Sequence, residues 1–329
     1  MSPRIADVLF VAAALDYFVA TLLFVRYLLG KTPEEKDGHF ASRLVGVGAL
    51  FHASHIVAAS LVWKVCPVAG VHFPVSVATA LMAGGYAVFR KRWRLDMLGA
   101  FVAPLALTAH LALRFTGSGP LDPTPRFRSA MLPVHVAMNV LGIALFSLAF
   151  AAAALFLVQE RLLKQKKTAG VFKRLPPLDA LDRAEHRFLL AGFPLLTLGI
   201  VTGTLFVRRV DAVTVADIVR TGFGYATWLL AAAVLFLRAS VGWRGRRAAY
   251  GTIAGFGFAV LVLALYTFRD SSPKDPKGTA GAASDVSTDT HVSAPSGASP
   301  SHWRSRSHGT GPSEVSPGLP AHASESSGT

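Results

Sequence analysis

Apolar runs of about 20 residues recur along this chain from its first residues to about position 268, and they constrain its fold more than any other feature. An α-helix needs a run of about that length to cross the hydrocarbon core of a bilayer. Charged residues make up only 16% of the sequence, against about a quarter in a typical soluble domain. Since a spanning segment must satisfy its backbone polar groups internally, we predict an all-α integral membrane protein, a bundle of about eight transmembrane helices.

The predicted polytopic membrane domain covers residues 1–269, and residues 270–329 follow as a separate segment. Its spanning helices are expected at about 5–29, 41–63, 73–89, 95–114, 131–159, 188–207, 221–240 and 248–268. The last sixty residues are rich in Ser, Gly, Pro, Ala and Thr, and such a segment buries too little apolar surface to fold. We therefore predict a disordered C-terminal tail. Its histidines are interpreted as scattered polar residues rather than a metal site: His291, His302, His308 and His322.

The basic residues indicate how the helices are oriented. Most Lys and Arg between the predicted helices follow the first, third, fifth and seventh, Arg90 and Lys91 among them. The positive-inside rule then places these loops in the cytoplasm and both termini outside. This pattern explains the net charge of +14 without a nucleic-acid partner. The single cysteine, Cys66, excludes an intrachain disulfide and a thiolate metal cluster.

Four histidines fall inside predicted membrane segments, where an ionisable side chain is costly and usually has a function or a partner. His52 and His55 lie on the second predicted helix, His110 on the fourth and His135 near the start of the fifth. A rise of about 1.5 Å per residue places His55, His110 and His135 at similar depth in the outer leaflet, with His52 one turn deeper. Three helices are thus expected to bring imidazoles to one layer.

Imidazole is a good axial ligand for haem iron, and an apolar pocket suits the porphyrin ring. His52 and His55 share a helix face, so they cannot approach one iron from opposite sides. A workable pair therefore takes one histidine from the second helix and one from the fourth or fifth. The alternative is that each imidazole hydrogen-bonds neighbouring helices as a structural cross-link. Gly199 and Gly203 form a GxxxG motif, which we interpret as helix packing.

Three segments resemble the cytochrome c assembly family of membrane proteins, the CcsA/ResC and HemX-like group. They read PVHVAMNVLGIALFSLAFAAAALFLVQERLLKQKK at 133–167, LPPLDALDRAEHRFLLAGFPLLTLGIVTGTLF at 175–206 and GYATWLLAAAVLFLRASVGWRGRRAAYGTIAGF at 224–256. In the second segment, we expect residues 175–187 to form an amphipathic link before the helix at 188–207. Together the segments cover about a third of the chain.

The resemblance implies haem handling at the outer face, for delivery to apocytochrome c with other assembly proteins. His135 matches the family histidine at the start of its helix, and His52, or His55 as the alternative, matches the N-terminal intramembrane one. We therefore expect haem as cofactor, His52, His55, His110 and His135 as its contacts, and His52 with His135 as the axial ligands of its iron. The loop 208–220 lacks the family's tryptophan-rich WGxxWxWD segment, and Phe236 stands where a later histidine is expected. These departures make the chain more similar to the HemX-like branch.

The sequence is compatible with three functions. The first is a non-enzymatic, haem-handling protein of cytochrome c assembly in the bacterial cytoplasmic (inner) membrane. The second is a HemX-type regulator or scaffold of haem biosynthesis that acts through its cytoplasmic loops, 160–187 and 238–247. The third, a small-solute transporter, is disfavoured because the sequence has no convincing internal repeat or pair of broken helices. Enzyme motifs such as a P-loop, GxSxG or HExxH are absent from the sequence, and we expect no catalytic activity.

Overall fold

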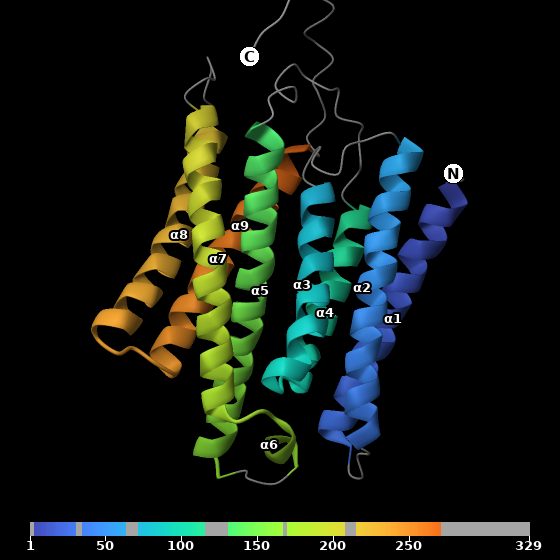
Figure 1. Cartoon of the computed structure of the whole chain (residues 1–329), viewed down its shortest axis with the longest axis vertical. Coiled ribbons are helices and arrows are strands. Elements are labelled where there is room, and N and C mark those ends of the chain that lie inside the picture. The colour runs from blue at the N-terminus through green and yellow to red at the C-terminus, as the bar shows by residue number, and fades with distance from the viewer. Residues whose placement is uncertain are drawn as a thin grey trace, which may run out of the picture. The chain divides into compact units, whose positions relative to one another are not determined.

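The computed structural model describes residues 3–30, 35–63, 72–115, 131–166, 170–207 and 215–270. These residues are helical apart from short connections, and they belong to one unit, Met1–Pro273 (Figure 1). The elements are α1 (Pro3–Leu29), α2 (Glu35–Trp63), α3 (His72–Trp93), η1 (Asp96–Leu98), α4 (Gly99–Phe115), α5 (Met131–Lys164), α6 (Val171–Arg174), α7 (Leu178–Val207), α8 (Val215–Ser240) and α9 (Arg246–Asp270). The predicted all-α membrane fold is confirmed. The predicted tail lies, except for Asp270, outside the described residues.

Successive long helices run in opposite directions, so the C-terminal ends of α1, α3, α5 and α8 gather at one end of the bundle, drawn at the bottom of Figure 1. The basic connections follow these four ends, as the positive-inside pattern predicts. We call this end the basic end.

Seven of the described helices are long and apolar enough to cross a membrane. Of the eight predicted spans, α3 is the one outside that group. Its polar Ser76 and Thr79 and the pair Gly84-Gly85 make it less apolar than its neighbours. In the bundle α3 nevertheless runs antiparallel to α2 and α4 (Figure 1).

The observed start of α7 corrects the expected boundary. The segment 175–187 was expected to be a link before a helix at 188, but the helix begins at Leu178 and continues without a break. The reason is that Asp182 and Glu185 are buried, so their polarity marks a protein interface rather than exposure to water. A similar extension moves the start of α8 to Val215 from the predicted 221.

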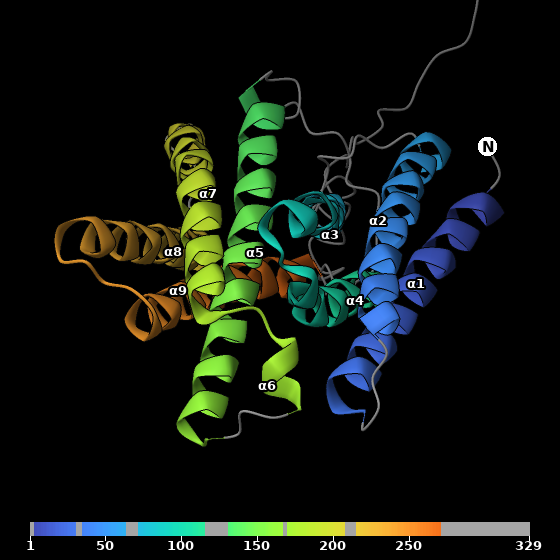
Figure 2. The ribbon, with the colours of Figure 1, turned by 60° about the horizontal axis from the view of Figure 1, so that its bottom comes forward.

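The long helix α5 lies at the centre of the helical packing and contacts α3, α7 and α9 (Figure 2). Its small residues Ala151, Ala152 and Ala153 are buried, which lets the neighbouring backbones approach closely. By contrast, α1 exposes a stripe of large apolar side chains at helical spacing, the surface a spanning helix presents to lipid. The stripe comprises Val8, Val11, Leu15, Phe18, Leu22 and Val25.

Candidate functional site

Three of the four predicted histidines lie together where α1, α2 and α4 meet. The ring centroids of His52 and His110 are 4.1 Å apart, and those of His55 and His110 are 6.0 Å apart. From α1, the Phe10 ring stacks on His110, with centroids 4.1 Å apart, and Tyr17 meets His52 edge-on. The structure therefore brings the imidazoles of two helices together under aromatic side chains of a third.

The hydrogen bonds of this cluster assign tautomers to two of its rings. Because Nε2 of His110 lies 3.1 Å from the carbonyl oxygen of Phe10, Nε2 carries the proton and Nδ1 is an acceptor. Nδ1 of His110 accepts from Nε2–H of His52 at 3.1 Å. The same Nε2 of His52 lies 2.8 Å from Ser76 Oγ. The remaining Nδ1 of His52 accepts from the Tyr17 hydroxyl at 3.4 Å. Both nitrogens of His52 and His110 are therefore engaged in cross-linking helices.

His55 differs from the other two rings. Its Nδ1 donates to the carbonyl oxygen of Ala6 at 2.8 Å, which leaves the lone pair on Nε2. Within the part of the chain that the structure describes, this Nε2 has no hydrogen-bond partner. Metal-binding histidines commonly donate one ring nitrogen to a backbone carbonyl while the other faces the metal. By this criterion His55 is better prepared than His52 to bind a ligand.

His135 occupies a different setting, where α5 crosses α7. The Thr202 hydroxyl donates to its own helix, at the carbonyl oxygens of Leu198 (2.7 Å) and Gly199 (3.0 Å). It therefore accepts from Nδ1–H of His135, 2.9 Å away. This hydrogen bond places the ring's lone pair on Nε2, and Nδ2 of Asn139 lies 3.4 Å from that atom. A hydroxyl of α7 thus selects the His135 tautomer that suits metal coordination through Nε2.

The GxxxG motif of α7 provides the space for this ring. A Cβ added at Gly203 would lie 2.7 Å from Cε1 of His135, and one added at Gly199 would meet the side chain of Asn139. His135 and Asn139 are four residues apart and so share one face of α5. The two glycines therefore accommodate two polar side chains of α5 as well as bringing the helices close together.

The predicted ligand pair comes from two separate groups of contacts. In the bundle α3 lies between α2, which carries His52 and His55, and α5, which carries His135 (Figure 1). Phe236, at the position of the family's later histidine, is 69% exposed on α8. Among the described residues, no group of three or more His, Cys, Asp or Glu side chains is arranged to hold a metal ion.

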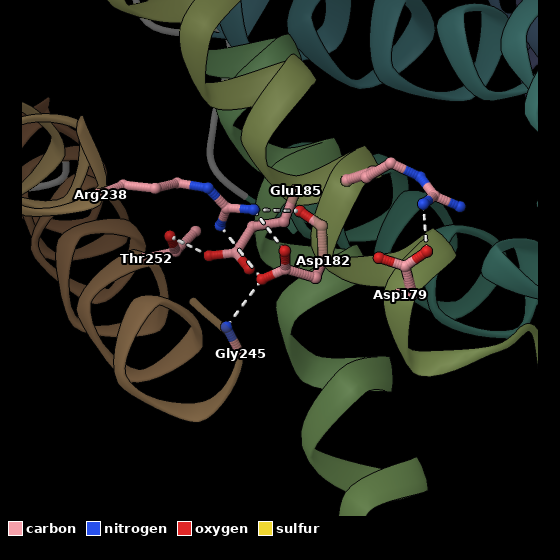
Figure 3. A network of polar contacts seen from close by, with 7 residues as sticks. Asp179, Asp182, Glu185, Arg238, Gly245 and Thr252 are labelled. Atoms are coloured by element: carbon pink, nitrogen blue, oxygen red, sulfur yellow. Dashed lines mark hydrogen bonds and ion pairs between the residues drawn. The ribbon is translucent and has the colours of Figure 1, made fainter. Parts of the chain in front are cut away.

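A second polar site, which the sequence analysis missed, joins α7, α8 and α9 at the basic end (Figure 3). The guanidinium of Arg238 donates to both carboxylate oxygens of Asp182, and the Gly245 amide donates to Oδ1 at 2.7 Å. One turn further along α7, Glu185 accepts from the Thr252 hydroxyl at 2.7 Å. The signal in the sequence was the spacing of Asp182 and Glu185, which are three residues apart. Because both lie within the predicted link 175–187, they were expected to face water.

Comparison with known proteins connects the α3–α9 region to a family. A model described as Cytochrome C assembly protein matches residues 67–271, which include His110 and His135. Cytochrome c biogenesis protein CcsA of Prochlorococcus marinus subsp. pastoris is 30% identical over 157 residues, 42% of this chain and 50% of that protein. CcsA of Guillardia theta is 28% identical over 188 residues, 51% of this chain and 61% of that protein.

Protein HemX of Brevibacillus brevis is also similar, at 33% identity over 82 residues, 25% of this chain and 30% of that protein. Relatives of both branches therefore match, and the expected preference for the HemX-like branch stays a prediction. The chain spans about half the length of the first CcsA relatives, 50% and 61% of the two described above. Since the family model covers more than half of the sequence, the chain belongs to the cytochrome c assembly protein family.

Proposed function

We propose that this protein takes part in cytochrome c assembly and handles haem near the outer face of the bacterial cytoplasmic membrane, with both termini outside. The observation that carries the proposal is the setting of His135. Its imidazole lies in a space left by Gly203, its Nδ1 donates to the Thr202 hydroxyl, and Nδ2 of Asn139 lies 3.4 Å from its Nε2. An imidazole in an apolar helical bundle, with its other nitrogen hydrogen-bonded, fits an axial ligand of haem iron.

The four histidines take different roles in this proposal. His135 is the residue that would hold haem iron, and His55, with its Nε2 lone pair, is the second candidate. His52 and His110 hold α1, α2 and α4 together through the hydrogen bonds described above. Bound haem would supply the iron and porphyrin, and the chain would position them for a partner such as apocytochrome c or another assembly protein. We propose a carrier rather than an enzyme.

The first test is an absorption spectrum of the detergent-purified full chain, oxidised and dithionite-reduced, with a pyridine haemochrome assay. We expect a Soret band and reduced α and β bands that are lost or strongly weakened in His135→Ala. The matched control is His39→Ala, a substitution of an exposed histidine at the basic end of the bundle. Haem content equal to that of the unaltered protein in His135→Ala would remove this residue from the proposal.

The same experiment separates the two functions weighed from the sequence. A colourless protein, expressed with ample haem and still monodisperse, would contradict haem handling and favour a regulator or scaffold that acts through its cytoplasmic loops. The match to protein HemX is the observation behind that alternative.

A further inference from the structure

A cavity of about 400 Å³ opens at the basic end, beside the network of Figure 3 and at the opposite end of α7 from Thr202. It lies between α7 and the α8–α9 connection. Its charged and titratable lining residues are Asp179, Asp182, Arg183, His186, Arg238 and Arg244. Neither the haem proposal nor the positive-inside pattern requires a hollow at this place.

The carboxylate of Asp182 already has hydrogen-bond and ion-pair partners within the protein. Arg238 and the Gly245 amide surround it, and the side chains of Asp182 and Arg238 are only 11% and 9% exposed. Asp179 pairs with Arg183 one turn along the same helix, in a solvent-exposed ion pair that is worth little. The two acids therefore leave little negative charge to face the cavity.

The cations of the lining are not fully neutralised. Three arginines face two aspartates, and within the described part of the chain Arg244 forms no ion pair or hydrogen bond. Nδ1 of His186 is buried and also has no hydrogen-bond partner among the described residues. Among the described residues, the cavity thus combines an unpaired guanidinium and an unpartnered imidazole nitrogen with a net positive charge, which together favour an anion.

We propose that this cavity binds a phosphate group, held mainly by Arg183, Arg244 and His186. Guanidinium groups match phosphate oxygens in geometry and charge. The position at the ends of spanning helices suits the headgroup of an anionic phospholipid, since basic pockets between helices on the cytoplasmic side recognise such headgroups. A free inorganic phosphate offers the same chemistry, and the experiment below separates the two sources.

The test uses the full chain purified in a neutral detergent and titrated with dioleoylphosphatidylglycerol or dioleoylphosphatidylcholine. Native mass spectrometry counts the bound lipids, and a parallel calorimetric titration uses sodium phosphate against sodium chloride of equal ionic strength. Arg183→Gln and Arg244→Gln should each weaken binding about fivefold. Arg92→Gln removes the same charge from an exposed position at the same end of the bundle and should change binding by less than about twofold.

Saturable binding of phosphatidylglycerol alone, weakened by the two cavity variants, would assign the site to a lipid headgroup. Binding of inorganic phosphate that the same variants weaken would assign it to the free ion. Binding of neither ligand, or an equal loss in Arg92→Gln, would overturn the proposal. Both cavity arginines lie at the surface side of the site, and an unchanged melting temperature in each variant confirms that the comparison concerns folded protein.

Discussion

The His135 ring lies against Gly203 of the neighbouring helix so closely that a methyl group at that glycine would fall 2.7 Å from Cε1 of the imidazole. Real side-chain contacts of carbon do not reach this distance. The absence of a side chain at Gly203 therefore determines both the position of the His135 ring and the close spacing of α5 and α7.

Gly203→Ala should displace His135 and separate α5 from α7 locally. We expect overpacking to lower the free energy of unfolding by about 1–3 kcal/mol and, if haem is bound there, to reduce haem per chain. Thermal unfolding in detergent and the haemochrome assay measure the two effects. Gly257→Ala is the matched control, because a Cβ there meets nothing within 4 Å. Equal stability and equal haem content in the two variants would contradict close packing of His135 against Gly203.

The N-terminal histidines should separate by role. His52→Ala removes a fully buried ring whose two nitrogens are both hydrogen-bonded, so we expect a clear loss of stability with retention of haem. His55→Ala removes the ring with an available Nε2, and we expect the reverse pattern, a small loss of stability and a loss of haem. Melting temperature and haem content, measured on the same preparations, distinguish the two. Haem loss confined to His52→Ala would reverse the assignment.

Removal of the Asp182 carboxylate should destabilise the basic end strongly. Asp182→Ala leaves the nearly buried Arg238 without its counter-ion and Gly245 N–H without its acceptor. The expected cost is about 3–5 kcal/mol, since an uncompensated buried charge remains. In Asp179→Ala, which breaks an exposed pair between side chains 57% and 72% exposed, we expect less than about 0.5 kcal/mol. Chemical unfolding of both variants in detergent gives the comparison, and similar losses would refute a special role for the buried pair.

Arg174, at the end of α6, closes the C-terminal end of α1. Its guanidinium donates to the carbonyl oxygens of Tyr27, Leu28 and Gly30. Because the helix ends here, these oxygens have no N–H donor further along the same helix. Arg174→Ala should therefore raise amide hydrogen exchange across Val171–Leu175 by at least about tenfold, because charged hydrogen bonds of this kind contribute about 1.5–3 kcal/mol. Lys173→Ala, the exposed neighbour, should leave exchange there nearly unchanged.

The positions of the spanning helices could be predicted from the sequence because each apolar run carries its own length signal. The start of α7 could not, since Asp182 is polar and yet buried, and its partner Arg238 lies 56 residues further along the chain. Local hydropathy contains no information about such a distant partner.

The histidines were predicted as candidates because an ionisable side chain is energetically costly in lipid. Their similar calculated depths placed His55 in one layer with His110, and the structure has these two rings 6.0 Å apart. Their grouping could not be predicted in full. Depth along a helix follows from residue number, whereas the direction of a side chain around the helix depends on which helices pack beside it. For that reason His135 contacts Thr202 of α7 while His52 contacts Ser76 of α3.

The separation of Asp182 from Arg238 also has a consequence for biosynthesis. When the first turns of α7 leave the ribosome, 56 residues remain to be made before their cation appears, a delay of roughly 3–11 s at ordinary rates of translation. During that interval the Asp182 carboxylate lacks its counter-ion, Arg238. We expect the first turns of α7 to pack stably only after α8 has left the ribosome, so that protease protection of the 178–187 segment in truncated nascent chains should begin once Arg238 has emerged.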